Sequence, residues 1–206
     1  MPSLTPSKIV CVGRNYAAHA KELGNDVPKE PLLFLKPPSS LIRSGESIRL
    51  PTVSNRVEYE GEIGVVIGTR LRKATVEQAR QAIASVCAAN DVTARDLQKS
   101  DVQFTRAKGF DTFCAVGDLG AVPNDLGQLR VRTLVNGQVR QDGHASDMVF
   151  DIPTLVSFIS GVMTLEAGDL VLTGTPDGVG TLSPGDVVEV EIAGVSRVSN
   201  PVIADA

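Results

Sequence analysis

The amino-acid sequence predicts a single α+β domain that is mostly β. Short apolar runs typical of strands are numerous, whereas runs with helical periodicity are few. The 206 residues suit one domain, assigned to 1–206, and 42% of them are hydrophobic, which is enough to fill a core. No internal repeat, low-complexity tract or linker divides the chain.

The first forty residues predict a buried strand, a short helix and a loop. Residues 8–13 form an apolar run that ends at a glycine, which is typical of a buried strand. Residues 15–23 predict a short helix, with Asn15 as its N-cap and Gly24 as its stop signal. The proline-rich segment 28–40 is expected to be a loop.

The middle of the chain predicts a core strand followed by the clearest helix. Residues 57–68 first alternate and then become wholly apolar, so this strand is expected to enter the core. Residues 75–89 are predicted as a helix, because Thr75 and Gln78 form a capping-box pattern. The apolar side chains that this helix would place on one face are Val76, Ala79, Ile83, Val86 and Cys87.

A β-hairpin is the strongest signal in the last third of the chain. Strands over 130–135 and 138–140 flank Asn136-Gly137, a dipeptide that favours a tight hairpin turn. The remaining expected elements are a helix over 153–163 and strands over 169–173 and 186–192, the two strands being joined by a Gly/Pro loop.

Composition and charge disfavour several classes of protein. The formal net charge of -4 argues against a nucleic-acid-binding protein. The three cysteines are odd in number and lack a C-x-x-C spacing, which disfavours both a disulfide framework and a zinc–thiolate site and favours a cytoplasmic location. The N-terminal residues lack a signal-peptide pattern and no apolar run is long enough to span a bilayer, so we expect no membrane partner.

A row of three glutamates is the most informative local pattern. On a strand, Glu58, Glu60 and Glu62 would lie on one face, with about 7 Å between neighbours. Because residues 63–67 are apolar, the row is expected to lead into the core, where Mg²⁺ or Mn²⁺ would relieve the repulsion between the carboxylates. The alternative is a solvated edge strand whose charges prevent aggregation.

The sequence resembles the fumarylacetoacetate hydrolase family, especially its short acylpyruvate hydrolases. The motifs that carry this resemblance run in order along nearly the whole chain, and together they are highly specific. They are GRNYAAHAKE (13–22), FLKP (34–37), YEGE (59–62), NDVTARDLQ (90–98), RAKGFD (106–111), QDG (141–143), SDM (146–148), TGTP (173–176) and GVG (178–180).

The resemblance implies a metal site and a fold. Glu60, Glu62 and Asp91 correspond to the family's ligands for Mg²⁺ or Mn²⁺, whereas Glu58 precedes the motif and is expected to be a bystander. Without the resemblance, Asp91 could equally be a turn or capping residue. The family's catalytic domain is a pseudo-barrel of mixed sheets with a few peripheral helices, and it is usually dimeric, so a homodimer is expected.

The resemblance also implies three catalytic residues. His19 and Glu22 correspond to the family's water-activating dyad, and their spacing of three would place them on one face of a helix. Lys108 corresponds to the lysine beside the metal, where it could stabilise an oxyanion or an enolate. Taken alone, the spacing of the dyad also suits a solvated helix face, and a lone lysine is usually on the surface.

Several further positions are expected to contact the substrate. Within the glycine-rich loop, Thr175 could meet a substrate carboxylate, although pure turn chemistry explains the glycines of that loop equally well. The sequence departs from the family at His144, where a smaller or polar residue is usual. The full set of expected substrate contacts is Arg14, Lys36, Gln98, Asp111 and Thr175.

The resulting hypothesis is a metal-dependent hydrolase of acylpyruvates that releases pyruvate and a carboxylic acid. Its substrate would be a small anionic 2-oxo acid. Two alternatives use the same metal-held enolate: decarboxylation of oxaloacetate and isomerisation of 2-hydroxyhepta-2,4-diene-1,7-dioate. An alternative from another class is a catalytically silent domain that binds a metal or a metabolite.

Overall fold

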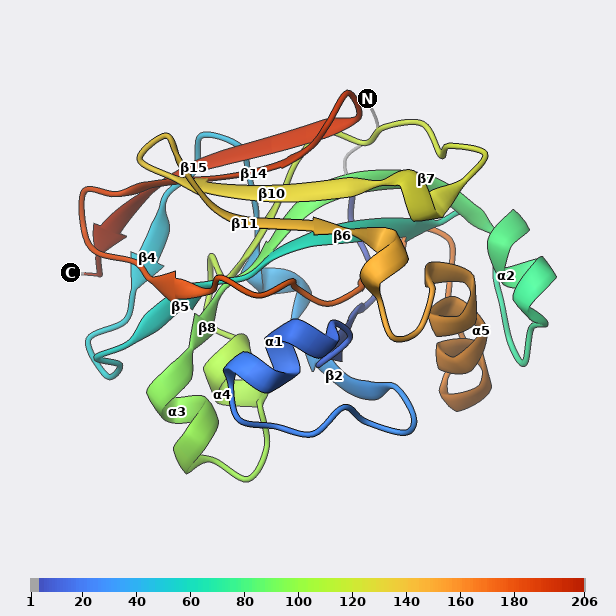
Figure 1. The fold of residues 1–206 in the computed structure, drawn as a ribbon, viewed down its shortest axis with the longest axis horizontal. Coiled ribbons are helices and arrows are strands. Elements are labelled where there is room, and N and C mark those ends of the chain that lie inside the picture. The colour runs from blue at the N-terminus through green and yellow to red at the C-terminus, as the bar shows by residue number, and fades with distance from the viewer. Residues whose placement is uncertain (1–3, 206) are drawn as a thin grey trace.

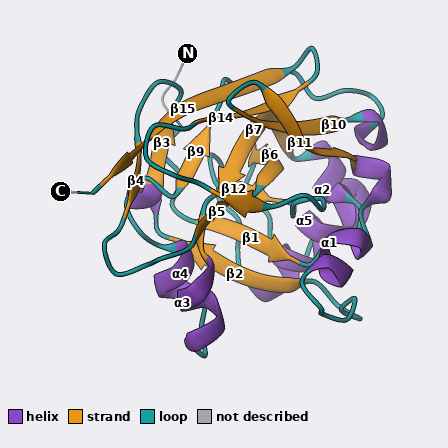
Figure 2. Cartoon of the chain, turned by 60° about the vertical axis from the view of Figure 1, so that its left-hand side comes forward, coloured by secondary structure: helices purple, strands orange, loops and turns teal. Residues whose placement is uncertain are grey.

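The computed structural model describes residues 4–205 and has curled, mixed sheets that form a half-barrel (Figure 1). In the view of Figure 1, β10, β14 and β15 form the upper layer, and most of the helices lie below and to the right of the sheets. Figure 2 shows β1 and β2 on the side opposite that layer. The prediction of a mostly β fold of the α+β class is confirmed.

The largest sheet has seven strands and contains the middle of the chain. Its order is β2 (Leu32–Lys36), β1 (Ile9–Gly13), β12 (Leu170–Leu172), β6 (Gly61–Ile67), β7 (Ile83–Asp91), β9 (Cys114–Val116) and β3 (Leu41–Arg43). The strands β6 and β7 lie near its centre, and their antiparallel register joins Gly61 to Asn90. This pairing brings the acidic end of β6 beside the end of β7.

Two smaller sheets complete the β structure. The five-stranded sheet has the order β11 (Gln138–His144), β10 (Arg130–Val135), β14 (Val187–Ile192), β15 (Ser196–Ala204) and β4 (Ile48–Leu50). The three-stranded sheet has the order β13 (Gly180–Thr181), β5 (Val57–Tyr59) and β8 (Thr93–Ala94).

The helices are short. They are α1 (Ala17–Glu22), α2 (Val76–Gln81), α3 (Arg95–Ser100), α4 (Thr105–Lys108) and α5 (Ile152–Val162), with 3₁₀ turns η1 (Pro38–Ser40), η2 (Leu126–Gln128) and η3 (Ala145–Asp147). Among the described residues, no helix has the length and apolar character needed to cross a membrane.

The core is built from the two faces of the seven-stranded sheet. On β6, Ile63 and Val65 belong to the larger apolar cluster, which also contains Val190 of the five-stranded sheet. Val66 points to the opposite face, where it joins a smaller cluster with Cys87. This alternation is the expected consequence of a strand buried on both faces.

The predicted helix over 75–89 is wrong beyond its first turns. The capping box of Thr75 and Gln78 is present, but α2 ends at Gln81 and the chain continues as β7. The strand β7 lies between β6 and β9, and from Val86 onward its side chains are buried on both faces of the sheet. Its nearly continuous apolar sequence fits a helix and a central strand equally well. Asp91 therefore lies at the end of a core strand.

Other boundaries differ for local reasons. The predicted loop 28–40 contains strand β2, and the predicted strand 57–68 divides at Glu60 into β5 and β6. The helix α1 begins at Ala17, with Tyr16 at the N-cap position and no side-chain cap. The predicted cap, Asn15, instead accepts the amide of Phe150 through its side-chain oxygen (2.9 Å) and donates to two distant carbonyl groups. The hairpin, the strand after residue 8 and the helix α5 are confirmed, with Asn136 at a positive φ of 53° in the hairpin turn.

Candidate active site

Three carboxylates meet where β5, β6 and β7 come together. Glu60 lies between β5 and β6, Glu62 is on β6, and Asp91 ends β7. All three are buried, and one oxygen of each lies within 4.8 Å of the others. The arrangement is fixed locally, because the Asp91 amide donates to the carbonyl of Glu60 (2.8 Å) and the Glu60 amide donates to the Asn90 side chain (3.0 Å).

Two buried lysines offset part of the charge of this acidic triad, which consists of Glu60, Glu62 and Asp91. The ammonium group of Lys108 donates to Glu60 (2.7 Å) and to Asp91 (2.6 Å). Lys36 donates to the other oxygen of Asp91 (2.6 Å). The cations therefore contact Glu60 and Asp91, and the three carboxylates are not electrostatically equivalent.

The pKa values follow this asymmetry. Burial alone would raise the pKa of Glu60, but Lys108 and Arg95 outweigh burial and hold the pKa well below its ordinary value. Burial raises the pKa of Glu62 well above its ordinary value, and the neighbouring charges of Asp91 and Glu60 raise it further. Glu62 is thus the carboxylate of the triad that most needs additional positive charge.

The triad suits a hard divalent cation. Its donors are all carboxylate oxygens, which Mg²⁺ and Mn²⁺ prefer. Within residues 4–205, Glu62 forms no ion pair; one of its oxygens accepts the amide of Gly174 (2.7 Å). A cation between the three side chains would neutralise Glu62, so Glu60, Glu62 and Asp91 are the residues that would hold it.

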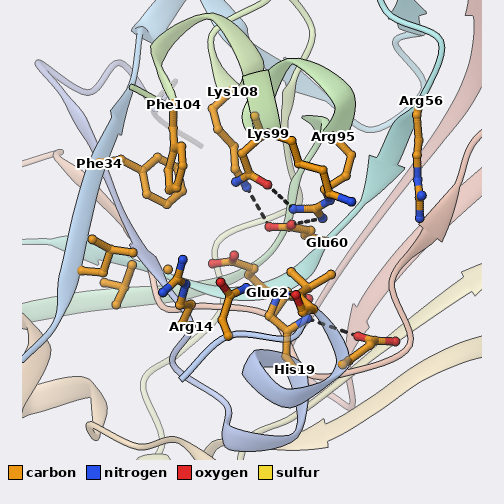
Figure 3. A pocket seen from close by; sticks show the side chains of 18 residues that line it. Arg14, His19, Phe34, Arg56, Glu60, Glu62, Arg95, Lys99, Phe104 and Lys108 are labelled. Atoms are coloured by element: carbon orange, nitrogen blue, oxygen red, sulfur yellow. Dashed lines mark hydrogen bonds and ion pairs between the residues drawn. The ribbon is translucent and has the colours of Figure 1, made fainter. Parts of the chain in front are cut away.

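A cavity of about 500 Å³ opens onto Glu60 and Glu62 (Figure 3). One part of its wall is apolar, and there the rings of Phe34 and Phe104 meet edge to face with their centroids 5.7 Å apart. The cations in its lining are Arg14, Arg56, Arg95, Lys99 and Lys108. A small anionic molecule would find both charge complementarity and an apolar surface here.

A histidine–glutamate pair from α1 lies at the same cavity. The Nδ1 atom of His19 lies 3.3 Å from Oε2 of Glu22, and the His19 side chain is only 6% exposed. The other oxygen of Glu22 accepts the amide of Gly178 (3.0 Å), which ties α1 to the glycine-rich loop. Glu22 therefore orients the imidazole and sets its tautomer, as a general base requires.

The comparisons with known proteins agree with this geometry. Residues 8–203 match the family described as "Fumarylacetoacetate (FAA) hydrolase C-terminal". The chain belongs to the fumarylacetoacetate hydrolase family. The match spans almost all the described residues, so the resemblance predicted from the motifs is confirmed.

Several members of the fumarylacetoacetate hydrolase family are similar over most of the chain. A Dictyostelium discoideum protein named "Oxaloacetate decarboxylase, mitochondrial" is 44% identical, over 93% of this chain and 91% of that protein. An Arabidopsis thaliana protein named "Oxaloacetate tautomerase FAHD1, mitochondrial" is 45% identical, over 93% and 89%. The structure of 2-hydroxyhepta-2,4-diene-1,7-dioate isomerase from Mycobacterium marinum has a TM-score of 0.89 at 44% identity, covering 98% and 76%.

The structure brings some, but not all, of the expected substrate contacts to the cavity of this family member. Arg14, Gln98 and Thr175 line it, and the backbone of Arg14 has a positive φ of 58°. Lys36 does not line the cavity, since its ammonium group is used by Asp91 and by a carbonyl group. Asp111 is exposed and also lies outside the lining, so the structure does not bring these two side chains to the cavity.

Sequence reasoning missed the importance of Arg95. This side chain is only 2% exposed and pairs with both Glu58 and Glu60. It belongs to the NDVTARDLQ motif, and an arginine shortly after a proposed metal ligand could have been recognised as a partner for the acidic row. Glu58 itself is fully buried, whereas His144 is exposed and is not part of the cavity lining.

Proposed function

We propose that this chain is a divalent-metal-dependent enzyme that interconverts the keto and enol forms of oxaloacetate. The observation that carries the proposal is the position of His19, an oriented base, at a cationic cavity that opens onto the acidic triad. Tautomerisation moves a proton between C3 and the 2-oxo oxygen: C3–H breaks as the enol O–H forms, and the reverse. A positioned imidazole can take the proton from C3 or return it there. Relatives named for oxaloacetate tautomerisation and decarboxylation support this substrate.

The charge of the site supports a dianionic substrate. Four carboxylates lie at or beside the triad, and four cations pair with three of them, so the formal charges of the eight groups cancel. The carboxylates are Glu58, Glu60, Glu62 and Asp91, of which Glu62 is the one without an ion pair to any described residue, and the cations are Lys36, Arg56, Arg95 and Lys108. A divalent cation would leave two positive charges in excess, which matches the two carboxylates of oxaloacetate. Arg14 and Lys99 add positive charge to the lining of the cavity.

Each group of the site has a distinct part in the proposed reaction. A divalent cation held by the triad would supply Lewis acidity toward the 2-oxo group and so favour enolisation. Burial alone would lower the pKa of Lys108, but Asp91 and Glu60 outweigh burial and raise it, so the ammonium group stays charged and can stabilise an enolate oxygen. His19 would take the proton from C3 and give it to the enol oxygen, or carry it in the opposite direction.

The proposal is tested by following the ultraviolet absorbance of enol-oxaloacetate with purified protein. We expect the rate of its disappearance to rise with Mg²⁺ or Mn²⁺ above the rate of the protein-free solution and to fall to that rate in EDTA. Replacing His19 with alanine should abolish most of the increase. An enzyme-catalysed rate that is unaffected by EDTA would contradict the metal-dependent reaction.

Hydrolysis of acylpyruvates is a second candidate, because the His19–Glu22 pair could instead activate a water molecule. The apolar wall formed by Phe34 and Phe104 could accommodate an acyl chain. Release of pyruvate from acetylpyruvate, coupled to lactate dehydrogenase, separates this reaction from tautomerisation, which releases no pyruvate. If His19→Ala abolished hydrolysis but spared decarboxylation of oxaloacetate, the water-activating role would be supported.

A further inference from the structure

Glu58 precedes the acidic triad and is fully buried, yet it is not one of the three carboxylates that converge. We propose that Glu58 is a positioning residue: it holds the Arg95 guanidinium, and through it Glu60 and Gln98, in the geometry that the metal and the substrate require. This inference rests on the function proposed above and deepens it, since it assigns a role to a side chain outside the triad.

The planar guanidinium group of Arg95 donates hydrogen bonds to three different side chains. Its Nε atom donates to Glu58 Oε2 (2.7 Å), one Nη donates to Glu60 Oε1, and the other donates to Gln98. Because these donors are coplanar and their directions are fixed relative to one another, holding the Nε edge sets the direction of both Nη groups. Glu58 is the group that holds this edge.

The first consequence concerns the proposed metal ligand Glu60. Its two oxygens face two different cations, since Oε1 accepts from Arg95 and Oε2 accepts from Lys108. The plane of the carboxylate is therefore fixed by both partners, and Figure 3 shows Glu60 with Arg95 and Lys108 on the same side. Partners of this kind orient metal ligands, and their loss typically weakens metal binding about 10- to 100-fold.

The second consequence concerns Gln98, which lines the cavity. A guanidinium group can only donate, so the atom of Gln98 that faces Arg95 must be the carbonyl oxygen. The amide nitrogen of Gln98 is then the end left to face an anionic substrate as a hydrogen-bond donor. The hydrogen bond from Arg95 thereby sets which end of the Gln98 amide faces the cavity, and Glu58 sets the position of Arg95.

Glu58 is itself placed by the backbone and by Arg56. In the three-stranded sheet it pairs with Thr93, and the amide of Arg95 donates to the carbonyl of Arg56 (2.7 Å). The second carboxylate oxygen of Glu58 accepts from Nε of Arg56 (2.6 Å), whose side chain is 55% exposed. The sheet therefore fixes the backbone of Glu58, and two arginines fix its carboxylate, as a positioning role requires.

Two conservative substitutions separate position from charge. Glu58→Gln keeps the reach of the side chain and one acceptor for Arg95 but removes the charge. Glu58→Asp keeps the charge but is shorter by one methylene group and should pull Arg95 out of place. Both substitutions leave a hydrogen-bond acceptor near Arg95, so its buried charge keeps polar partners and both proteins should fold. Thermal unfolding would verify this.

Calorimetric titration of the metal-free protein with Mn²⁺ gives a readout that does not depend on turnover. We expect Glu58→Gln to bind Mn²⁺ within about threefold of the unsubstituted protein and Glu58→Asp to bind it at least about tenfold more weakly. With oxaloacetate, Glu58→Asp should also raise KM more than it lowers kcat, since Gln98 is displaced. Matched controls are Glu191→Gln and Glu191→Asp, because Glu191 pairs with Arg132 in the five-stranded sheet, outside the lining of the cavity.

The proposal is overturned by any of three results: Glu58→Asp binds Mn²⁺ as tightly as the unsubstituted protein, Glu58→Gln is impaired as much as Glu58→Asp, or the Glu191 variants show the same losses. Failure of the proposed function would look different. The unsubstituted protein would then leave the rate of oxaloacetate tautomerisation unchanged, while the Mn²⁺ titrations would still decide the role of Glu58.

Discussion

Two groups of carboxylate–arginine pairs in this molecule differ in their exposure to solvent. In the wall of the cavity, the Arg95 side chain is 3% exposed and forms hydrogen-bonded ion pairs with Glu58 and Glu60. On the five-stranded sheet, Arg197 is 64% exposed and pairs with Glu189. A broken surface pair leaves two solvated ions, whereas a broken buried pair leaves a charge without solvent or partner. The buried pairs at the cavity therefore hold their side chains in fixed positions, whereas the exposed pair on the five-stranded sheet contributes little to stability.

The largest effect is expected for the buried cation Lys108. The substitution Lys108→Met should lower the free energy of unfolding of the metal-free protein by about 3–5 kcal/mol, because it removes the partner of two buried carboxylates. Denaturant unfolding would measure the change. Added Mn²⁺ should restore part of the loss, since it supplies positive charge at the triad; a variant as stable as the unsubstituted protein would contradict the role of Lys108 as counter-charge.

Removal of the proposed base should affect catalysis rather than stability. His19→Ala is expected to reduce the tautomerisation rate by roughly 10²- to 10⁴-fold, the range typical of general acid–base catalysis. Its midpoint of thermal unfolding should change little, because His19 has one long hydrogen bond, of 3.3 Å, to Glu22. If the rate were unchanged, the proton transfer would have to be assigned to another group.

Asp169, a buried carboxylate outside the cavity, is expected to make a contribution to stability that depends on pH. Burial alone would raise the pKa of Asp169, but hydrogen bonds from the Glu166 amide, Lys8 and Ser7 outweigh burial and lower it. Because the folded-state pKa lies below the unfolded value of about 3.9, the carboxylate stabilises the fold above that pH and ceases to do so as pH falls through the lower, folded-state pKa.

The substitution Asp169→Asn should therefore cost about 1–3 kcal/mol of unfolding free energy at pH 7. The gap between variant and unsubstituted protein should narrow at acidic pH, below about 3.9. Urea unfolding across a pH series would measure both quantities. A gap that stayed constant or widened toward acidic pH would show that the charge of Asp169 is not what stabilises the fold.

The smallest effect is expected on the surface of the five-stranded sheet. Arg197→Ala removes the partner of Glu189, and the free energy of unfolding should fall by no more than about 1 kcal/mol. The oxaloacetate rate should be unchanged, because this pair lies outside the lining of the cavity. A loss as large as that of Lys108→Met would remove the distinction between the two regions.

The sequence predicted the acidic triad well, because ordered motifs carry information that strand periodicity alone lacks. The alternation of a strand predicts that Glu60 and Glu62 share a face, whereas the NDVTARDLQ motif is needed to place Asp91 with them. The length of β7 could not be predicted: its buried apolar residues suit a helix and a central strand equally, and only pairing with β6 and β9 decides between them.

The role of Glu58 was outside the reach of sequence reasoning for a different physical reason. A glutamate is usually solvated, and its burial is explained only when a partner from another segment is known. That partner, Arg95, lies 37 residues further along the chain. The positions of Lys36 and Asp111 could not be predicted either, because both residues belong to matching motifs although their side chains lie outside the lining of the cavity.

We infer that Glu60, Glu62 and Asp91 hold a divalent cation on which the reaction of oxaloacetate depends. The most direct measurement is the tautomerisation rate of EDTA-treated protein as Mn²⁺ is added, corrected for the protein-free reaction, for the unsubstituted chain and for Glu62→Gln. We expect saturable recovery of the rate in the unsubstituted chain and little recovery in Glu62→Gln at the same Mn²⁺ concentrations. Full activity in EDTA, or identical titration curves for both proteins, would contradict it.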